Sequence, residues 1–296
     1  MSAVPTVAPE ADAAVTAREA RRRPRPPGFD RAFVFPTLFM LAFLVYFLMP
    51  LGWLFIASTK SLDDLFSSFG LWFSGFNLVD NIGDTFSKDD GVFGTWLRNT
   101  LLYAFVSAIG AALLAAAAGY GFAKFAFRGR EALFWFVLGA VMVPNTAIAV
   151  PLFLLFSKIG LTNSPLSIIL PSAVSPFGVY LMRIYAEAAV PSEVIEAARL
   201  DGASELRIFR TIAFRLLAPG AVTVMIFAFV TTWNNYFLPL TMLSEPKWYP
   251  LTVGITELGP TGILIGSLLA IAPMILAFVL LQRYWETGLS AGAVNG

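Results

Sequence analysis

The chain has 296 residues, of which 57% are hydrophobic and only 13% are charged, and its formal net charge is +1. Soluble domains are usually about 45–50% apolar and about 25% charged, so an ordinary water-soluble fold is excluded. The near-zero net charge gives no indication of a nucleic-acid partner. Because the chain contains neither Cys nor His, thiol and imidazole catalysis, disulfides and the usual zinc sites are excluded as well. We therefore expect an integral membrane protein with no catalytic centre, no metal site and no cofactor.

The N-terminal segment, residues 1–28, is rich in Ala, Pro and Arg and shows no apolar periodicity. This composition predicts a disordered basic tail, with the arginines at positions 21–25 acting as a topology anchor.

Residues 29–287 are predicted to form a transmembrane domain, because six charge-free apolar stretches approach or exceed the roughly 20 residues that a membrane-spanning helix needs. Continuous apolar runs indicate helices, since the strands of a membrane barrel alternate in polarity. Internal prolines favour kinked helices that pack against protein. The fold class is thus an all-α membrane protein with six transmembrane helices. The six stretches are Phe33–Ala57, Asn99–Ala123, Ala132–Ser157, Leu166–Met182, Leu216–Ser244 and Leu258–Gln282.

The basic residues predict the orientation, because Lys and Arg accumulate in cytoplasmic segments. If both termini are cytoplasmic, 15 of the 20 basic residues fall on the cytoplasmic side. An even number of spans agrees with this arrangement, and residues 288–296 then form a cytoplasmic C-terminal tail. The five basic residues on the other side are Lys60, Lys88, Arg98, Lys158 and Lys247.

The segment Lys60–Arg98, predicted to be external, mixes acids with aromatic side chains. Two interpretations stay open: a docking surface for an external protein, or an interfacial aromatic belt with solvated turns. The acids are Asp63, Asp64, Asp80, Asp84, Asp89 and Asp90, and the aromatics are Phe66, Phe69, Trp72, Phe73 and Phe76.

The segment from Val190 to Pro219 predicts a short helix, a glycine turn and an amphipathic helix that returns to the membrane. Pro191 and Glu193 suit a first helical turn. Asp201-Gly202 breaks that helix, since Gly tolerates the left-handed conformation, and Ser204 can cap the next helix. Leu206, Phe209, Ile212 and Leu216 are predicted to share one apolar stripe. An ordinary linker between two spans is the simpler interpretation of these features.

The residues EAARLDGAS, from Glu196 to Ser204, resemble the EAA loop of ATP-binding cassette importer permeases. Phe209, Ile212 and Pro219 continue the family pattern in register, whereas Phe214-Arg215 replaces the usual Leu-Pro. The stretches Val143–Pro171, Pro176–Tyr185, Thr232–Leu240 and Gly288–Gly296 resemble the carbohydrate-uptake branch, similar to the smaller maltose permease subunit.

This resemblance implies a sugar or oligosaccharide importer in the plasma membrane of a bacterium or archaeon. A second homologous permease would complete the pathway, and an extracytoplasmic solute-binding protein would deliver the solute. The EAA loop, between spans four and five, would contact a cytoplasmic ATPase dimer. The chain has no Gly-Lys pair and hence no P-loop, so another subunit must supply ATP hydrolysis. The coupling residues implied are Glu196, Ala197, Ala198, Asp201, Gly202 and Ala203.

The predicted fifth span contains aromatic and amide side chains of the kind that bind sugars. Two adjacent amides in a membrane are costly unless they face protein or water. They could therefore line the pathway or bond to neighbouring helices. The candidates are Trp233, Asn234, Asn235 and Tyr236, with Asn145 in the third span.

Other functions remain open at this stage. An ion-coupled secondary transporter would share six spans, but it would more often carry ionisable residues inside them. Within the family, glycerol-3-phosphate or its diesters are the alternative substrates. Arg183 and Glu187, four residues apart, are predicted to form an interfacial ion pair and not a proton relay.

Overall fold

The computed structural model describes residues 31–293, and within this range every regular element is helical. The predicted basic tail lies outside the described residues, as do the last three residues of the chain. Residues 288–293, placed in the predicted C-terminal tail, continue the last helix. The chain divides into two units, residues 1–53 and residues 54–296.

The described part of the first unit is most of helix α2, Arg31–Ser58. Apolar side chains project from it in every direction: Phe35, Met40 and Tyr46 are each more than 70% exposed. A helix that is apolar on all sides is typical of a membrane span. The candidate span Val34–Ser58 confirms the predicted stretch Phe33–Ala57.

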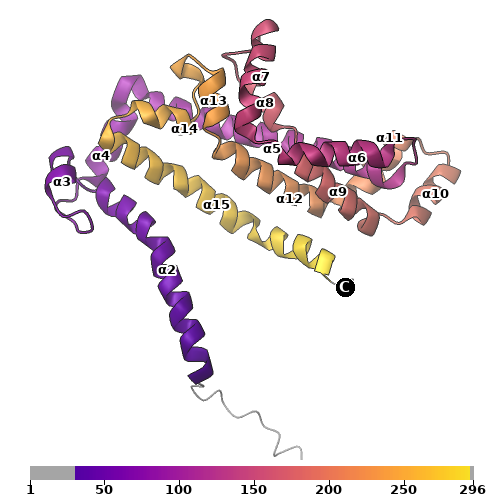
Figure 1. The fold of residues 1–296 in the computed structure, drawn as a ribbon, viewed down its shortest axis with the longest axis horizontal. Helices are drawn as coiled ribbons and strands as arrows, with labels where there is room; N and C mark the ends of the chain where they lie inside the picture. The colour runs from indigo at the N-terminus through magenta and orange to yellow at the C-terminus, as the bar shows by residue number, and fades with distance from the viewer. Residues whose placement is uncertain (1–30, 294–296) are drawn as a thin grey trace, which may run out of the picture. The chain divides into compact units, whose positions relative to one another are not determined.

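The second unit holds the remaining helices, joined by short turns (Figure 1). Beside short 3-10 turns, they are α3 (Leu62–Ser67), α4 (Leu78–Ser87), α5 (Val92–Lys124), α6 (Arg130–Gly139), α7 (Asn145–Lys158), α8 (Leu166–Ser172), α9 (Pro176–Ala189), α10 (Ser192–Leu200), α11 (Glu205–Ile208), the π-helical turn η3 (Phe209–Ala213), α12 (Phe214–Trp233), α13 (Phe237–Met242), α14 (Leu251–Gly254) and α15 (Pro260–Ala293).

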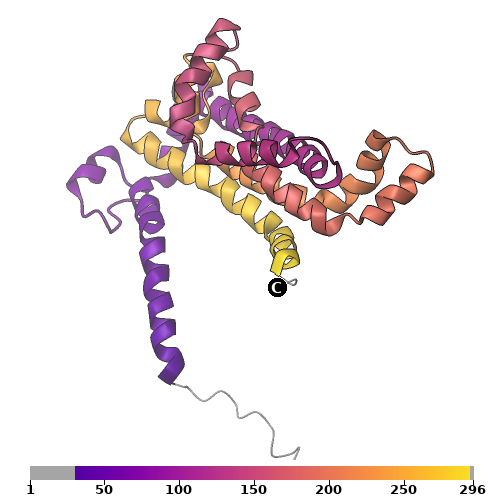
Figure 2. The same ribbon diagram turned by 45° about the vertical axis from the view of Figure 1, so that its right-hand side comes forward.

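Helices α5, α9 and α12 pack together to form the centre of this unit (Figures 1 and 2). Alanines line the buried face of α5, and small residues let helix backbones approach closely. A Cβ added at Gly178 of α9 would lie 2.8 Å from Val224 of α12. One at Gly220 of α12 would lie 2.9 Å from Tyr185 of α9. Small residues therefore define where these three helices cross.

The connection between α13 and α14 is tied to the first turns of α5. Four side chains on one face of α5 bond to it, because positions 96, 99, 100 and 103 follow the helical repeat. The Asn99 amide donates to the carbonyls of Lys247 (2.8 Å) and Tyr249 (3.1 Å). Trp96 and Tyr103 donate to the carbonyls of Pro246 and Trp248, and Thr100 accepts from the Leu251 amide. These bonds from α5 constrain the connection.

The predicted third span, Ala132–Ser157, is not one kinked rod. The helical segments Arg130–Met142 and Asn145–Lys158 meet at an angle of 104°. Pro144, at the N-cap of α7, has no N–H to continue the preceding helix. The break is therefore a broken span or a re-entrant turn.

The predicted boundaries of the fifth span were wrong. The candidate span runs over Glu205–Trp233, so it ends before the polar residues that the prediction Leu216–Ser244 had placed inside it. The Asn234 amide donates to its own helix at the Val230 carbonyl (2.8 Å), and the Asn235 side chain accepts from the Leu238 amide (3.3 Å). Short amide side chains compete with the helical ladder in this way, and α12 ends here.

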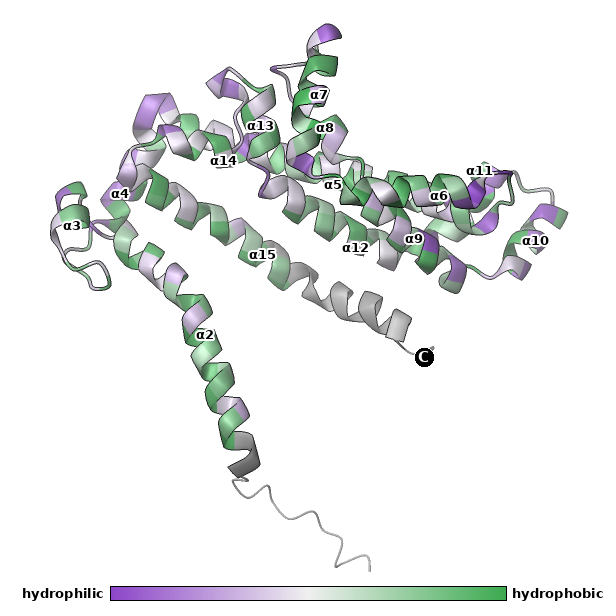
Figure 3. Cartoon of the chain, viewed as in Figure 1, coloured by the Kyte–Doolittle hydropathy of each residue, from purple (hydrophilic) through white to green (hydrophobic). Residues whose placement is uncertain are grey.

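The fourth span, predicted as Leu166–Met182, is found over Leu166–Ala189 with an interruption between α8 and α9. The Ser175 hydroxyl accepts from the Gly178 amide (3.0 Å), and Pro176 begins α9. The predicted sixth span, Leu258–Gln282, coincides with the first part of α15, whose apolar segment is Pro260–Leu276. Figure 3 shows the apolar residues along α5, α12 and α15, and more polar residues on α10 and α11.

Candidate coupling loop and candidate pathway residues

Helix α10 forms from a short amphipathic segment. Pro191 precedes it with extended backbone, and Glu193 lies in its first turn, where a carboxylate is stabilised by the helix dipole. Helix α10 ends in a Schellman turn, with the Ala203 N–H bonded to the Ala198 carbonyl and the Gly202 N–H bonded to the Arg199 carbonyl, both at 3.0 Å.

Gly202 adopts the left-handed backbone conformation that this turn requires, with φ of +78°. The prediction that Asp201-Gly202 breaks the helix is confirmed. A Cβ added at Gly202 would meet nothing within 4 Å, so the glycine is required by the backbone angle and not by crowding within this chain.

A bidentate ion pair joins the two sides of the turn. Arg199 Nε lies 2.7 Å from Glu205 Oε1, and Nη2 lies 3.2 Å from Oε2. The bond to Glu205 raises the pKa of Arg199 above its ordinary value. The same guanidinium lies 5.9 Å from the centre of the Phe125 ring. Because a fork-shaped contact restricts orientation as well as distance, α11 is held against the end of α10. Ser204 stands at the N-cap of α11, as predicted, but its side chain makes no capping bond there.

Three buried side chains seat the loop on the core. Ile195, Ala198 and Ile208 are at most 8% exposed. They pack with residues of α5, α9 and α12 in one apolar cluster that also contains Val190 and Leu217. The turn is thus fixed to the helices that cross the second unit.

The predicted apolar stripe of the second helix holds for Phe209 and Ile212, which are half-buried against the core cluster, and was wrong for Leu206 and Leu216. Leu206 is 66% exposed and Leu216 is exposed, whereas Ile208, Ala213 and Leu217 are buried. The π-helical turn over residues 209–213 inserts one extra residue, so the buried residues Ile208 and Ala213 are five positions apart and a stripe counted at α-helical spacing misses them.

The outward face of the loop carries charged and apolar residues side by side. Glu196, Ala197, Asp201 and Gly202 are exposed, whereas Ala198 faces the core and Ala203 is half-buried. Leu200 is 89% exposed, and the sequence analysis did not select it. Its position could have indicated this exposure, because Leu200 directly precedes the Asp201-Gly202 turn and lies on the side of α10 opposite the residues buried against the core.

The four polar and aromatic candidates of the fifth span differ in accessibility. Trp233 is 3% exposed and stacks on Phe229 with ring centres 5.6 Å apart. Asn234 and Tyr236 are exposed, and Asn235 is half-buried. The Asn235 carbonyl accepts from the Thr252 hydroxyl (2.8 Å), which ties the end of α12 to α14.

A cavity of about 390 Å³ opens beside Trp233 and Asn234. Its lining has hydroxyl, amide and apolar groups and no charged side chain. Asn145 does not contribute to it; this residue is exposed at the first position of α7, where the third span breaks. The remaining lining residues are Leu251, Thr252, Ile255, Ser267, Ala270, Ile271 and Met274.

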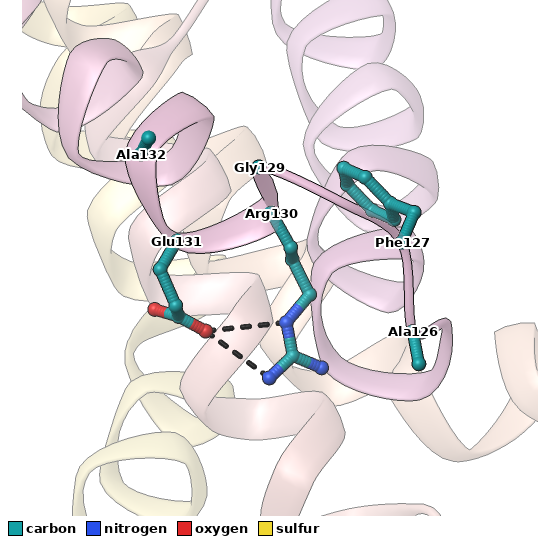
Figure 4. Close-up of a pocket in the computed structure, with 6 residues that line it drawn as sticks. All are labelled: Ala126, Phe127, Gly129, Arg130, Glu131 and Ala132. Carbon is teal, nitrogen blue, oxygen red and sulfur yellow. Dashed lines mark hydrogen bonds and ion pairs between the residues drawn. The ribbon is translucent and has the colours of Figure 1, made fainter.

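A second cavity, of about 370 Å³, lies at the turn between α5 and α6 and is lined by Ala126, Phe127, Gly129, Arg130, Glu131 and Ala132 (Figure 4). Its two charged groups are paired: Arg130 contacts the Glu131 carboxylate at 3.1 Å. Arg183 of α9 bonds to both oxygens of that carboxylate, at 2.8 and 3.1 Å. The predicted pair between Arg183 and Glu187 is also present, at 3.1 Å, but sequence reasoning missed Glu131.

A family model described as a binding-protein-dependent transport system inner membrane component matches residues 108–290. The arabinooligosaccharides transport system permease protein AraQ of Halalkalibacterium halodurans is 34% identical over 212 residues, covering 70% of this chain and 76% of that protein. AraQ of Bacillus subtilis is 31% identical over 88% of this chain and 95% of its own length. The lactose transport system permease protein LacG of Rhizobium radiobacter is 31% identical over 86% of this chain and 93% of its own length.

Among solved structures, a chain of a bacterial ABC transporter involved in the import of the acidic polysaccharide alginate superimposes with a TM-score of 0.74. The match covers 88% of this chain and 99% of that one at 21% identity. It therefore supports the all-helical permease fold.

Proposed function

We propose, because this chain belongs to the family of binding-protein-dependent transport system inner membrane components, that it forms half of the membrane pathway of an ATP-driven sugar or oligosaccharide importer. The similarity to AraQ and LacG supports carbohydrate as the substrate class. The chain would span the plasma membrane of a bacterium or archaeon six times, with both termini in the cytoplasm. A second homologous permease would supply the other half, and an extracytoplasmic binding protein would deliver the solute.

The observation that carries the coupling role is the construction of the α10–α11 turn. Its inner side is buried against the core through Ile195, Ala198 and Ile208, while Leu200 and Glu196 project outward. A surface that is rigid on one side and partly apolar on the other suits contact with a partner protein. The partner would be a cytoplasmic ATPase, whose movement would pass through the turn to the helices that seat it. The coupling residues are Glu196, Ala197, Ala198, Asp201, Gly202 and Ala203, with Leu200 added.

The substrate assignment is supported by the uncharged cavity beside Trp233 and Asn234. Hydroxyl and amide groups among apolar side chains suit a neutral polyol. A phosphate or phosphodiester would favour Arg or Lys in the lining, and none of the lining residues is basic. We therefore favour a neutral sugar over glycerol-3-phosphate. Deleting the gene and testing growth on single sugars and on glycerol-3-phosphate checks this: loss of growth on glycerol-3-phosphate alone would overturn it.

Two matched substitutions test the coupling role in the complete importer. Gly202→Asp places a side chain and a charge at the outward turn, and Gly129→Asp does the same at another exposed glycine with φ of +81° and no neighbour within 4 Å. Both variants carry the same backbone strain, so strain alone cannot separate them.

We expect both variants to reach the membrane in normal amounts. Only Gly202→Asp should lose the ATPase on purification and lose solute uptake, because an unpaired carboxylate buried at an interface costs several kcal/mol. Leu200→Ser, which adds no backbone strain, should weaken ATPase retention as well. Full retention and full uptake in both Gly202→Asp and Leu200→Ser would remove the coupling role from this turn.

A further inference from the structure

The segment that follows α2 closes into a loop covered with exposed aromatic side chains; we call residues 61–77 the aromatic loop. Residues 65–79 contain no charged side chain. Phe66, Phe69, Trp72 and Phe76 are between 67% and 75% exposed. Such a density of exposed aromatic groups is costly in water and marks a contact surface.

A buried lysine holds this loop in shape. Lys60 is 1% exposed, and its ammonium group donates to the Ser68 hydroxyl at 2.8 Å and to the Phe69 carbonyl at 2.7 Å. Ser68 in turn donates to the Asp64 carbonyl at the end of α3. The ammonium group of Lys60, the residue that directly precedes the loop, is thus bonded inside the loop and is not presented outward.

The loop returns to the point where it leaves the helix. The Asn77 N–H donates to the Thr59 carbonyl at 2.8 Å. The Asn81 amide donates to the carbonyls of Ser58 (3.0 Å) and Lys60 (2.9 Å). Both ends of the loop therefore lie at the end of α2, which is also the end of the candidate span Val34–Ser58.

The loop also folds back beside the apolar helix. The Phe73 ring packs edge-on against Phe55, with centres 6.4 Å apart, and Trp72 packs against Phe73 at 6.3 Å. Phe55 lies within the apolar span, three residues before its end. Since a helix rises about 1.5 Å per residue, this contact sets the loop at the depth of the last turn of the span and not above it.

We propose that the aromatic loop inserts Phe66, Phe69, Trp72 and Phe76 into the boundary between headgroups and acyl chains, on the membrane face where α2 ends. Trp and Phe on a charge-free segment at the end of a span suit this zone. The loop contains no basic residue, and its two charged residues, Asp63 and Asp64, are acidic and precede its uncharged part, so it does not select anionic lipids. A soluble partner is the competing occupant; its docking would need these rings to stand in water until it arrives.

The natural absence of cysteine makes depth measurable at single positions. Spin labels are attached at Phe66→Cys, Phe69→Cys, Trp72→Cys and Phe76→Cys, one at a time. The full chain, with its co-purifying subunits, is placed in nanodiscs of phosphatidylethanolamine and phosphatidylglycerol. Two references bracket the range: Val45→Cys in the middle of α2, and Ser87→Cys at the exposed end of α4.

For each label we compare the collision rate with oxygen to the collision rate with a water-soluble nickel chelate. We expect this oxygen-to-nickel ratio to be several-fold higher for labels on the aromatic loop than for the label at Ser87. Their values should fall between the two references. Oxygen-to-nickel ratios equal to that of Ser87 at all four sites would overturn membrane insertion and favour the soluble partner.

The lysine provides a second test, independent of label chemistry. Lys60→Met keeps the length of the side chain and removes the ammonium group, so the loop should open. The label at Phe69→Cys should then become several-fold more accessible to the nickel chelate. An unchanged ratio in Lys60→Met would show that the lysine does not hold the loop at its depth.

Discussion

Gly119 of α5 lies directly against Met182 of α9: a Cβ added at position 119 would stand 2.5 Å from the Met182 Cβ and 2.6 Å from its carbonyl carbon. Distances this short to backbone atoms leave no room for a methyl group. The glycine thus permits the close crossing of two central helices, and Met182, 0% exposed, fills the space around it.

Replacing this glycine should separate the two helices. We expect Gly119→Ala to destabilise the folded protein by about 1–3 kcal/mol, the usual cost of an overpacked core. Gly121→Ala is the matched control, because its added Cβ would meet nothing within 4 Å. The melting temperatures of the two variants are compared by thermal unfolding in detergent, monitored by size-exclusion chromatography. Equal melting temperatures for the two variants would show that the crossing is not close.

The bonds from Asn99 predict the behaviour of the connection between α13 and α14. Asn99→Ala leaves the carbonyls of Lys247 and Tyr249 without their donor, at about 1 kcal/mol for each hydrogen bond lost. The connection should open more often, and trypsin should cleave solubilised protein after Lys247 faster than in the unchanged chain. Arg98→Gln, at the exposed neighbouring position, should leave the rate at Lys247 unchanged. If trypsin cleaves Asn99→Ala after Lys247 at the rate of the unchanged chain, the bonds from Asn99 do not hold this connection closed.

The contacts of Arg183 depend on the several N–H donors of its planar guanidinium group, so lysine should not replace it. Its guanidinium bonds to Glu131 and Glu187 at once and lies 4.1 Å from the centre of the Phe134 ring. An ammonium group reproduces neither the bidentate contact nor the stacking. Because the carboxylates are half-exposed, we expect Arg183→Lys to cost only about 1 kcal/mol.

The measurement is again thermal unfolding in detergent, with Arg128→Lys at an exposed turn as the control. If Arg128→Lys loses as much stability as Arg183→Lys, the effect comes from any replacement of arginine by lysine and not from the lost bidentate contact of Arg183.

The orientation predicted from the basic residues can be tested with impermeant thiol reagents in intact cells. Ser87→Cys, at the exposed end of α4, should be labelled from outside. Ser204→Cys, in the candidate coupling loop, should react only after the membrane is dissolved in detergent. Labelling of Ser204→Cys in intact cells would reverse the orientation and place the loop out of reach of a cytoplasmic ATPase.

Several features of this protein follow from the sequence alone, because they depend on composition or on neighbouring residues. Low charge and long apolar runs predict a membrane protein, since the hydrocarbon core accepts little else. Asp201-Gly202 predicts the end of α10, because glycine alone takes the left-handed angle without strain. The i, i+4 spacing of Arg183 and Glu187 predicts their ion pair.

Tertiary structure decided what depends on residues distant in the chain or on local departures from regular helix. The π-helical turn over residues 209–213 puts the buried side chains Ile208 and Ala213 five positions apart, and no count at a fixed period includes that step. Glu131 meets Arg183 across 52 positions. Trp233 is nearly buried because it packs in one apolar cluster with residues of α5 and α14, among them Ala108 and Leu251. Sequence patterns specify which residues can form a helix or a turn, whereas packing between helices selects the side chains that face inward.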